Sequence, residues 1–287
     1  METLTRGPAA PILGEVSGLE WYFPRDVSEV PALLARDGVF PHAGGTGILR
    51  AGLGRFRGLM DIARLGLDSV QRRGGETTVG AAASYASAAR AIAAGEPGHI
   101  IAQSLSQAAT TPLRNRITVG GSLALFPYWS DLAGPLIALG AEVDLLGGAG
   151  GTWPFVEYAA RKDLRQASMV SGVRWKDAGG SAAYYRHTRT RVDHPAFTFT
   201  ILVRFTDGSP RRISDARIVV VGCTGRYRRL SAAEKGLAGA DPARVSLEEV
   251  SAADEVDFPA RMGFSPEYLR HCARIQLRRT LARALGR

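Results

Sequence analysis

The sequence predicts an α+β fold, with a two-part α/β region followed by a sheet covered by helices. Strands and helices alternate from Leu19 to about residue 175, and two glycine pairs each follow a short apolar or β-branched run. After residues 176–182 the pattern becomes strand-rich, and at 287 residues the chain is long enough for two domains. The expected divisions are an N-terminal extension in 1–18, a first domain in 19–177 with subdomains of about 19–65 and 66–177, and a C-terminal domain in 178–287.

The first expected helix lies in residues 24–38, PRDVSEVPALLARDG. Its start signal is Asp26 or Ser28, and Gly38 is its stop signal. Its apolar residues are Val30, Leu33 and Leu34. A short strand, VFPHAGG, follows in residues 39–45 and runs into the first glycine turn.

The alternation continues through the second subdomain. We expect a strand over 77–84, a helix over 85–98 that ends in Gly-Glu-Pro-Gly, and another helix over 99–110. The segment DLAGPLIALGAEVDLLGG then predicts a helix ending near Gly140 and a strand over 141–146.

The C-terminal domain begins with strands. PAFTFTILVRFTDG alternates and ends in an Asp-Gly turn, and ARIVVVGCTGRYRRL is expected as a second strand of a hairpin or meander. Three helical segments follow, LSAAEKGLAG, SLEEVSAADEV and the terminal residues 265–287. The last has Ser265 as a capping candidate and Pro266 at its first position. Its expected apolar face consists of Tyr268, Cys272, Ile275 and Leu277.

Composition excludes several classes of protein. No run of eighteen apolar residues occurs, which argues against a membrane span, and the N-terminus has no signal-peptide pattern. The two cysteines, Cys223 and Cys272, form at most one disulfide and cannot hold an iron–sulfur cluster alone, so a reducing cytoplasm is the simplest setting. The net charge is +9, but the arginines are spread along the chain without a nucleic-acid motif, so we expect no nucleic-acid partner.

No side-chain catalytic site or metal site is predicted. The histidines lack metal-ligand spacing, and no serine lies in a Gly-x-Ser-x-Gly elbow. Asp131, His187, Asp193 and His194 are possible acid–base groups, but such residues in polar loops are usually solvated. His42 precedes the first turn and is expected to be packed or exposed without a chemical role. Any chemistry is therefore expected to come from a cofactor, with no catalytic residue in the chain.

The two glycine motifs are the main candidates for binding. AGGTG in residues 43–47 and TVGGS in residues 118–122 can bring backbone N–H groups close to an anion. Neither is a Walker loop or a complete Gly-x-Gly-x-x-Gly fingerprint. Each alone is more often structural, but two at strand ends in an α/β setting favour a diphosphate.

The arginines of the C-terminal helix admit two interpretations. They recur at four-residue spacing with one acid, Glu267, nearby. One interpretation is a solvated face that suits the negative end of the helix dipole, and the other is docking to an acidic partner. The arginines concerned are Arg270, Arg274, Arg278, Arg279, Arg283 and Arg287.

Three separated motifs resemble the FAD-binding subunit of the molybdenum hydroxylases, the family of the carbon monoxide dehydrogenase medium subunit and the xanthine dehydrogenase flavin domain. They are WYFPRDVSEVPALLARDGVFPHAGGTGIL, TPLRNRITVGGSLALFPYWSDLAGPLIALGAEVDL and EYLRHCARIQLRRTL. They stand in the family's order and span nearly the whole chain. The resemblance implies a two-part FAD-binding domain of the vanillyl-alcohol-oxidase type, followed by a C-terminal flavoprotein domain.

The resemblance also implies which residues hold FAD. The two glycine motifs would surround the diphosphate, with Ser130 and Asp131 near the ribityl or flavin portion. Arg186, or His187 or Arg189 if the alignment shifts, would bring a positive charge to the isoalloxazine and stabilise the anionic reduced flavin. The implied cofactor-binding residues are Ala43, Gly44, Gly45, Thr46, Gly47, Arg114, Thr118, Val119, Gly120, Gly121, Ser122, Ser130, Asp131 and Arg186.

Three features depart from the family pattern. Ser122 replaces the usual Asn, Gly47 stands where Asp, Ser or Glu is common, and LFPYW replaces a more polar loop. The first two remove side-chain contacts to the cofactor. In the loop, Tyr128 or Trp129 would stack on the cofactor or pack against a partner.

The resemblance implies an oxidoreductase subunit that passes electrons from a 2Fe-2S small subunit to an external acceptor. A large molybdopterin subunit would supply those electrons, and the complex would be a dimer of heterotrimers. The alternatives are a flavin-free structural subunit, suggested by Ser122 and Gly47, and a stand-alone flavin oxidase.

Overall fold

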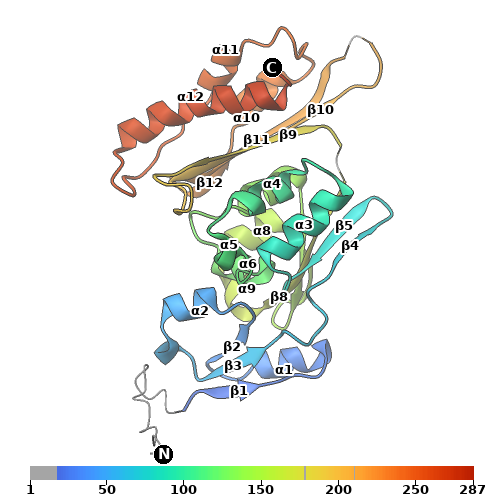
Figure 1. The fold of residues 1–287 in the computed structure, drawn as a ribbon, viewed down its shortest axis with the longest axis vertical. Coiled ribbons are helices and arrows are strands. Elements are labelled where there is room, and N and C mark those ends of the chain that lie inside the picture. Colours follow the sequence, from blue (N-terminus) through green and yellow to red (C-terminus); the bar gives the residue numbers. More distant parts are fainter. Residues whose placement is uncertain (1–17, 178, 210) are drawn as a thin grey trace, which may run out of the picture.

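The computed structural model describes residues 18–177, 179–209 and 211–287. It is elongated and contains three sheets that follow one another along its long axis (Figure 1). This arrangement confirms the predicted α+β fold, with a two-part N-terminal region and a C-terminal sheet covered by helices. The predicted N-terminal extension lies outside the described residues, apart from Gly18. The proposed domain boundaries remain predictions.

The first sheet is a small parallel one in the order β1-β3-β2. A short helix, α1, packs on it through the buried Val30, and Asp26 accepts from the Ser28 N–H just before that helix, as its capping signal predicted. The elements are β1 (Glu20–Tyr22), η1 (Val27–Glu29), α1 (Val30–Leu34), β2 (Val39–His42), α2 (Thr46–Ala51), η2 (Leu53–Arg55) and β3 (Gly58–Asp61).

The second sheet has five antiparallel strands in the order β4-β5-β8-β6-β7. The predicted strand over 77–84 ends early, at Gly80, because the chain then turns to place Ser84 as the cap of α3. The strands are β4 (Val70–Arg73), β5 (Glu76–Gly80), β6 (Glu142–Leu146), β7 (Gly151–Pro154) and β8 (Met169–Lys176). The helices are α3 (Tyr85–Gly95), α4 (Ile100–Gln107), α5 (Thr111–Arg114), α6 (Val119–Leu125), α7 (Ala133–Leu139), α8 (Phe155–Ala160) and α9 (Lys162–Ala167).

The third sheet is an antiparallel meander in the order β12-β11-β10-β9. The single strand expected from ARIVVVGCTGRYRRL is instead a hairpin, because Gly225 and Arg226 adopt positive φ angles of 83° and 77°. The elements are β9 (Ser181–His187), β10 (Phe197–Phe205), β11 (Ile213–Cys223), β12 (Arg226–Arg229), α10 (Ser231–Leu237), α11 (Leu247–Ala252) and α12 (Pro266–Ala284).

The third sheet has apolar contacts on both faces. One face carries Tyr184, Leu202 and Val219, which belong to the same core as α4 and α7 of the second region. The other face packs against α10 and α12 (Figure 1). The sheet therefore lies between the N-terminal region and the C-terminal helices. Among the described residues, no helix has the length and apolarity needed to cross a bilayer.

Candidate functional site

A cavity of about 820 Å³ lies between the first and second sheet regions and reaches the C-terminal sheet. Both glycine motifs line it, together with residues of the loop before α7 and of β9. Twelve of the fourteen sequence-predicted residues are in its lining: Ala43, Gly44, Gly45, Thr46, Gly47, Thr118, Gly120, Gly121, Ser122, Ser130, Asp131 and Arg186. The fold thus brings together segments about 75 residues apart in the sequence, as the two-motif pattern predicted.

The first glycine motif joins β2 to α2. Gly45 has a φ of +74°, a conformation that favours glycine, and it directly precedes the first helical residue, Thr46. No side chain caps this end of α2. The first N–H groups of a helix have no partner within the helix. Thr46 and Gly47 both line the cavity, so their N–H groups are available to an acceptor bound there.

Gly44 of the first motif packs tightly against Arg116, which lies two residues before the second motif. A Cβ on Gly44 would lie 1.5 Å from the carbonyl oxygen of Arg116, so no other residue fits there. The Arg116 guanidinium also donates to the Gly44 carbonyl from Nε at 3.2 Å and from Nη2 at 3.0 Å. Gly44 therefore allows two backbone segments to pack closely. Gly47, by contrast, has only Leu125 Cδ2 nearby, 3.8 Å from the position of a Cβ.

The second glycine motif is not a turn after a strand, as the sequence suggested, but the first turn of α6. Thr118 has extended backbone and caps this helix by accepting from the Gly121 N–H at 3.3 Å. The β-branched run before it contributes only one isolated bridge, between Thr118 and Ser84. A threonine two residues before a glycine pair satisfies the rules of a helix start as well as those of a turn, and the cap formed by Thr118 shows that it is a helix start.

Most backbone donors of the second motif are already used. The Val119 N–H donates to Ala83 O at 2.9 Å and the Gly120 N–H to Ala81 O at 2.8 Å. A Cβ on Gly120 would also lie 2.5 Å from that of Ala81. The second motif therefore holds α6 against the segment after β5. The longest of these hydrogen bonds, from the Gly121 N–H to the Thr118 hydroxyl, is the weakest.

Ser122 has a partner of its own. Its hydroxyl is hydrogen-bonded to the phenol of Tyr85, the first residue of α3. Tyr85 is buried, and burial raises its pKa well above the usual value. The serine that replaces the family's usual asparagine thus belongs to a paired hydroxyl contact at the cavity.

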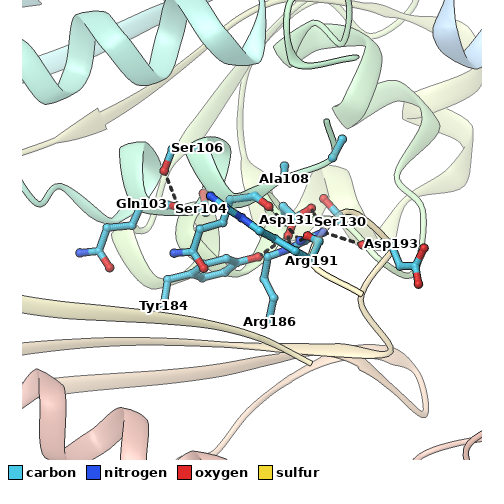
Figure 2. A network of polar contacts seen from close by, with 12 residues as sticks. Gln103, Ser104, Ser106, Ala108, Ser130, Asp131, Tyr184, Arg186, Arg191 and Asp193 are labelled. Carbon is cyan, nitrogen blue, oxygen red and sulfur yellow. Dashed lines mark hydrogen bonds and ion pairs between the residues drawn. The ribbon is translucent and has the colours of Figure 1, made fainter. Parts of the chain in front are cut away.

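Asp131 lies in a buried network with two residues of β9 (Figure 2). Arg186 donates to its carboxylate from Nε at 2.6 Å and from Nη2 at 3.3 Å, and the Tyr184 hydroxyl donates at 2.6 Å. Burial raises the pKa of Asp131, while Arg186 and Tyr184 oppose that effect. Because two charge-assisted hydrogen bonds hold the carboxylate, we assign it the ionised form. Asp131 is therefore not the solvated loop residue that the sequence suggested.

Three side chains from separate segments meet at the rim of the cavity. The Arg50 Cζ lies 4.4 Å from the centre of the Trp129 ring, and the His194 ring centre lies 4.5 Å from it. Arg50 Nη1 lies 3.3 Å from His194 Nε2, which accepts if the imidazole is neutral. Partial burial first, then the charges of Arg50 and Arg186, lower the pKa of His194 and favour that neutral form. Arg50 and Trp129 also line a second cavity of about 510 Å³.

Two predicted residues lie outside the cavity lining. Arg114 donates to the carbonyl groups of Ala108 and Ala109, at 2.8 and 2.9 Å, and so fixes the segment between α4 and α5. Val119 is buried in the core of the second region. The two alternatives to Arg186 are also outside it: His187 stacks on Phe197 at 4.7 Å, and Arg189 is exposed.

Residues that sequence reasoning missed at this site are Arg50, Tyr85 and Arg116. Arg116 lies two residues before Thr118, so a cation just before the second glycine motif was the available signal. Arg50 and Tyr85 carried no signal, because their roles depend on contacts across the cavity.

In residues 18–177, 179–209 and 211–287, no three His, Cys, Asp or Glu side chains are grouped so as to hold a metal ion. Both cysteines are free, and burial raises the pKa of Cys223 to about 11, so its thiol is protonated near neutrality. His42 is partly buried at the end of β2, and burial lowers its pKa.

Two family models match this sequence. The FAD binding domain in molybdopterin dehydrogenase matches residues 16–174, and the CO dehydrogenase flavoprotein C-terminal domain matches residues 182–284. A search of curated proteins finds no match.

Solved structures share the fold over nearly the whole chain. Quinoline 2-oxidoreductase from Pseudomonas putida 86 has a TM-score of 0.83 at 20% identity, with 93% of this chain and 97% of that chain covered. Reconstituted CO dehydrogenase from Oligotropha carboxidovorans has a TM-score of 0.83 at 21% identity, with 94% and 98% covered. CO dehydrogenase from Hydrogenophaga pseudoflava, in a form lacking the Mo-pyranopterin moiety, has a TM-score of 0.82 at 21% identity, with 93% and 97% covered.

Proposed function

Since this chain belongs to the family of FAD-binding flavoproteins of the molybdopterin dehydrogenases, a family of oxidoreductases, we propose that FAD lies in the cavity between its two sheet regions. We further propose that the chain passes electrons from the iron–sulfur clusters of a partner subunit to an external acceptor. The observation that carries the proposal is the convergence of both glycine motifs on one cavity of about 820 Å³. That volume lies in the range typical of cofactor sites.

The residues around the cavity fit a dinucleotide. The uncapped start of α2 offers backbone N–H groups to a diphosphate, with open space at Gly47 for its approach. The second motif contributes shape and the weakly bonded Gly121 N–H. We therefore assign the diphosphate donors mainly to residues 45–47, a less even division than the sequence suggested.

The flavin end is assigned to the side of the cavity that carries Ser130, Asp131 and Trp129. FAD, when bound, supplies the one- and two-electron chemistry that side chains cannot provide. The chain's own contribution is to bind and orient the cofactor and to limit access at the rim. No described side chain is assigned a proton-transfer step.

We propose a large molybdopterin subunit and a 2Fe-2S small subunit as partners, in a dimer of heterotrimers. The two free thiols of this chain, Cys223 and Cys272, support this division of labour, because a cluster needs about four thiolates. Free thiols also suit the proposed cytoplasmic location. Co-expression with the adjacent reading frames and size-exclusion chromatography test the assembly, and a chain that stays monomeric and reduces an acceptor alone supports the stand-alone oxidase instead.

Flavin content tests the cofactor site directly. The purified full chain, loaded with FAD and desalted, is expected to retain about one flavin per chain, with absorbance near 450 nm, roughly the position set by the cofactor itself. Acid release followed by chromatography identifies the flavin. Folded protein that retains no flavin at micromolar concentration would favour the flavin-free structural subunit.

A further inference from the structure

We infer that Arg186 is a positioning residue that fastens the loop of residues 188–196 over the flavin end of the cavity, rather than a cation that contacts the flavin. The inference rests on the proposed FAD site and names how that site is closed. It changes the role that the family resemblance suggested for this arginine.

The N–H donors of Arg186 are all engaged by protein acceptors. Arginine has five N–H groups, and five hydrogen bonds account for them at Arg186. Nε and Nη2 donate to Asp131, Nη1 donates to Gln107 O at 2.8 Å and to Arg191 O at 3.3 Å, and Nη2 donates to Asp193 O at 3.1 Å. None of its N–H groups is left for a cofactor atom.

The acceptors of Arg186 lie on two separate parts of the protein. Gln107 is the last residue of α4, and Asp131 lies in the loop before α7, so both belong to the second sheet region. Arg191 and Asp193 belong to the loop between β9 and β10. The guanidinium therefore joins that loop to the region that contains the second glycine motif (Figure 2).

The ion pair between Arg186 and Asp131 is buried, and its two charges oppose each other. The side chains of Arg186 and Asp131 are 6% and 8% exposed, so the ion pair is screened little by solvent. The carboxylate beside it offsets the arginine's charge, which weakens any field it projects toward the flavin. Lysine keeps the charge but has a single ammonium that cannot reach four separate acceptor groups. It therefore cannot substitute for arginine where the role depends on geometry.

The fastened loop presents His194 at the rim. His194 contacts Trp129 and Arg50, which belong to the other two segments that line this end. Arg186 on the inside and His194 on the rim thus hold the same loop at two places. Loss of the inner attachment is expected to displace His194 and open the flavin end.

The test uses the full chain loaded with FAD and compares Arg186→Lys with the wild type. We expect the FAD dissociation constant to rise by about tenfold, equivalent to about 1.4 kcal/mol, with an altered visible circular dichroism of the bound flavin. The matched control is Arg72→Lys. Arg72 lies on β4, pairs with Asp177 and Glu96, and does not line the cavity. That control should leave both readouts unchanged.

The competing role predicts a different result. A direct cation beside the flavin would be largely rescued by lysine, so wild-type affinity and wild-type dichroism in Arg186→Lys overturn the inference. His194→Ala provides a second test that leaves the buried ion pair intact and therefore applies even if Arg186→Lys does not fold. His194→Ala should also raise the FAD dissociation constant and alter the visible circular dichroism of the flavin. Unchanged values in this variant contradict closure of the site by this loop. A wild-type chain that binds no FAD would instead defeat the proposed function itself.

Discussion

At the scale of single residues, the glycines of the two motifs differ in what they do. Gly44 and Gly120 have no room for a side chain because another part of the protein occupies that space. Gly47 has room for one and lies in a helix, where glycine is less favourable than alanine by roughly 0.5–1 kcal/mol. The sequence pattern alone treats these three glycines as equivalent.

Gly44→Ala is therefore expected to destabilise the chain by about 1–3 kcal/mol, the usual cost of overpacking. Its Cβ would press on the backbone carbonyl of Arg116, which cannot rotate away as a side chain would. Urea unfolding of the cofactor-free protein measures the change. Gly47→Ala is the matched control and should leave the free energy of unfolding equal or slightly higher, and equal losses in both variants would contradict this distinction.

The Ser122 and Tyr85 hydroxyls give a second prediction at this scale. Ser122→Ala leaves the buried Tyr85 phenol without its partner, at a cost of about 1–3 kcal/mol. Tyr85→Phe removes the other half of the pair. Unfolding of both single variants and the double variant gives the coupling, and strictly additive losses would show that the two hydroxyls do not stabilise each other.

At the scale of elements, α12 shows what periodicity predicts and what it misses. The start of this helix is as predicted, with the Ser265 hydroxyl accepting from the Tyr268 N–H and Pro266 in the first turn. Of the predicted apolar face, Leu277 is buried and Cys272 is half-buried against the same core, whereas Tyr268 is 47% exposed. The buried residues are Leu269, Ala273, Leu277, Thr280, Leu281 and Ala284. An arginine-rich helix with few apolar residues has a weak pattern, so the sheet beneath it selects the face.

The same contacts bear on the two interpretations of the C-terminal arginines. Arg283 donates to Tyr184 O at 3.1 Å and Arg287 donates to Val245 O at 2.9 Å, so these two have structural partners. Arg270 pairs with Asp257 and Glu267 on the surface. Part of the arginine stripe therefore holds the helix in place, which neither interpretation included.

Leu281→Ala is expected to destabilise the chain by about 2–5 kcal/mol, because it leaves a cavity between α12 and the third sheet. Tyr268→Ala on the exposed side should cost clearly less. Thermal or urea unfolding compares the two variants. A larger loss for Tyr268→Ala would support the face that the sequence predicted.

At the scale of the whole molecule, the third sheet depends on its neighbours. Its residues Tyr184, Leu202, Val219 and Val221 are buried in the core of the second region. A fragment of residues 178–287 would expose that apolar face to water. We expect the fragment to self-associate or aggregate, as judged by size-exclusion chromatography with light scattering, and a stable monomeric fragment would show that the C-terminal domain is independent.

Acid stability is also a property of the whole chain. Burial lowers the pKa of His42, His99, His187 and His194 below the usual value of 6.5. The unfolded chain thus binds protons in a pH range where the folded chain does not, so stability falls as the pH drops below about 6.5. Urea unfolding at pH 7.5 and pH 5.5 measures this change. Between these pH values, the free energy of unfolding is expected to fall more in the wild type than in His194→Ala. Equal stability at both pH values would contradict it.

The sequence by itself determined the α+β class, the starts of helices such as α3 and α12, and the two motifs that converge on one cavity. These features follow from local rules, such as caps, glycine conformation and hydrophobic period, which a short segment carries with it. Its resemblance to the flavoprotein family, now confirmed by both family models, also depends on such segments.

Only the tertiary structure decided the roles within the site. It showed that Thr118 starts a helix, that Gly44 and Gly120 serve packing, and that the N–H groups of Arg186 are all engaged by protein acceptors. The physical reason is that each of these roles depends on which atoms a group meets across the chain. A side chain's donors and free space are consumed by distant neighbours, and spacing along the sequence does not record them.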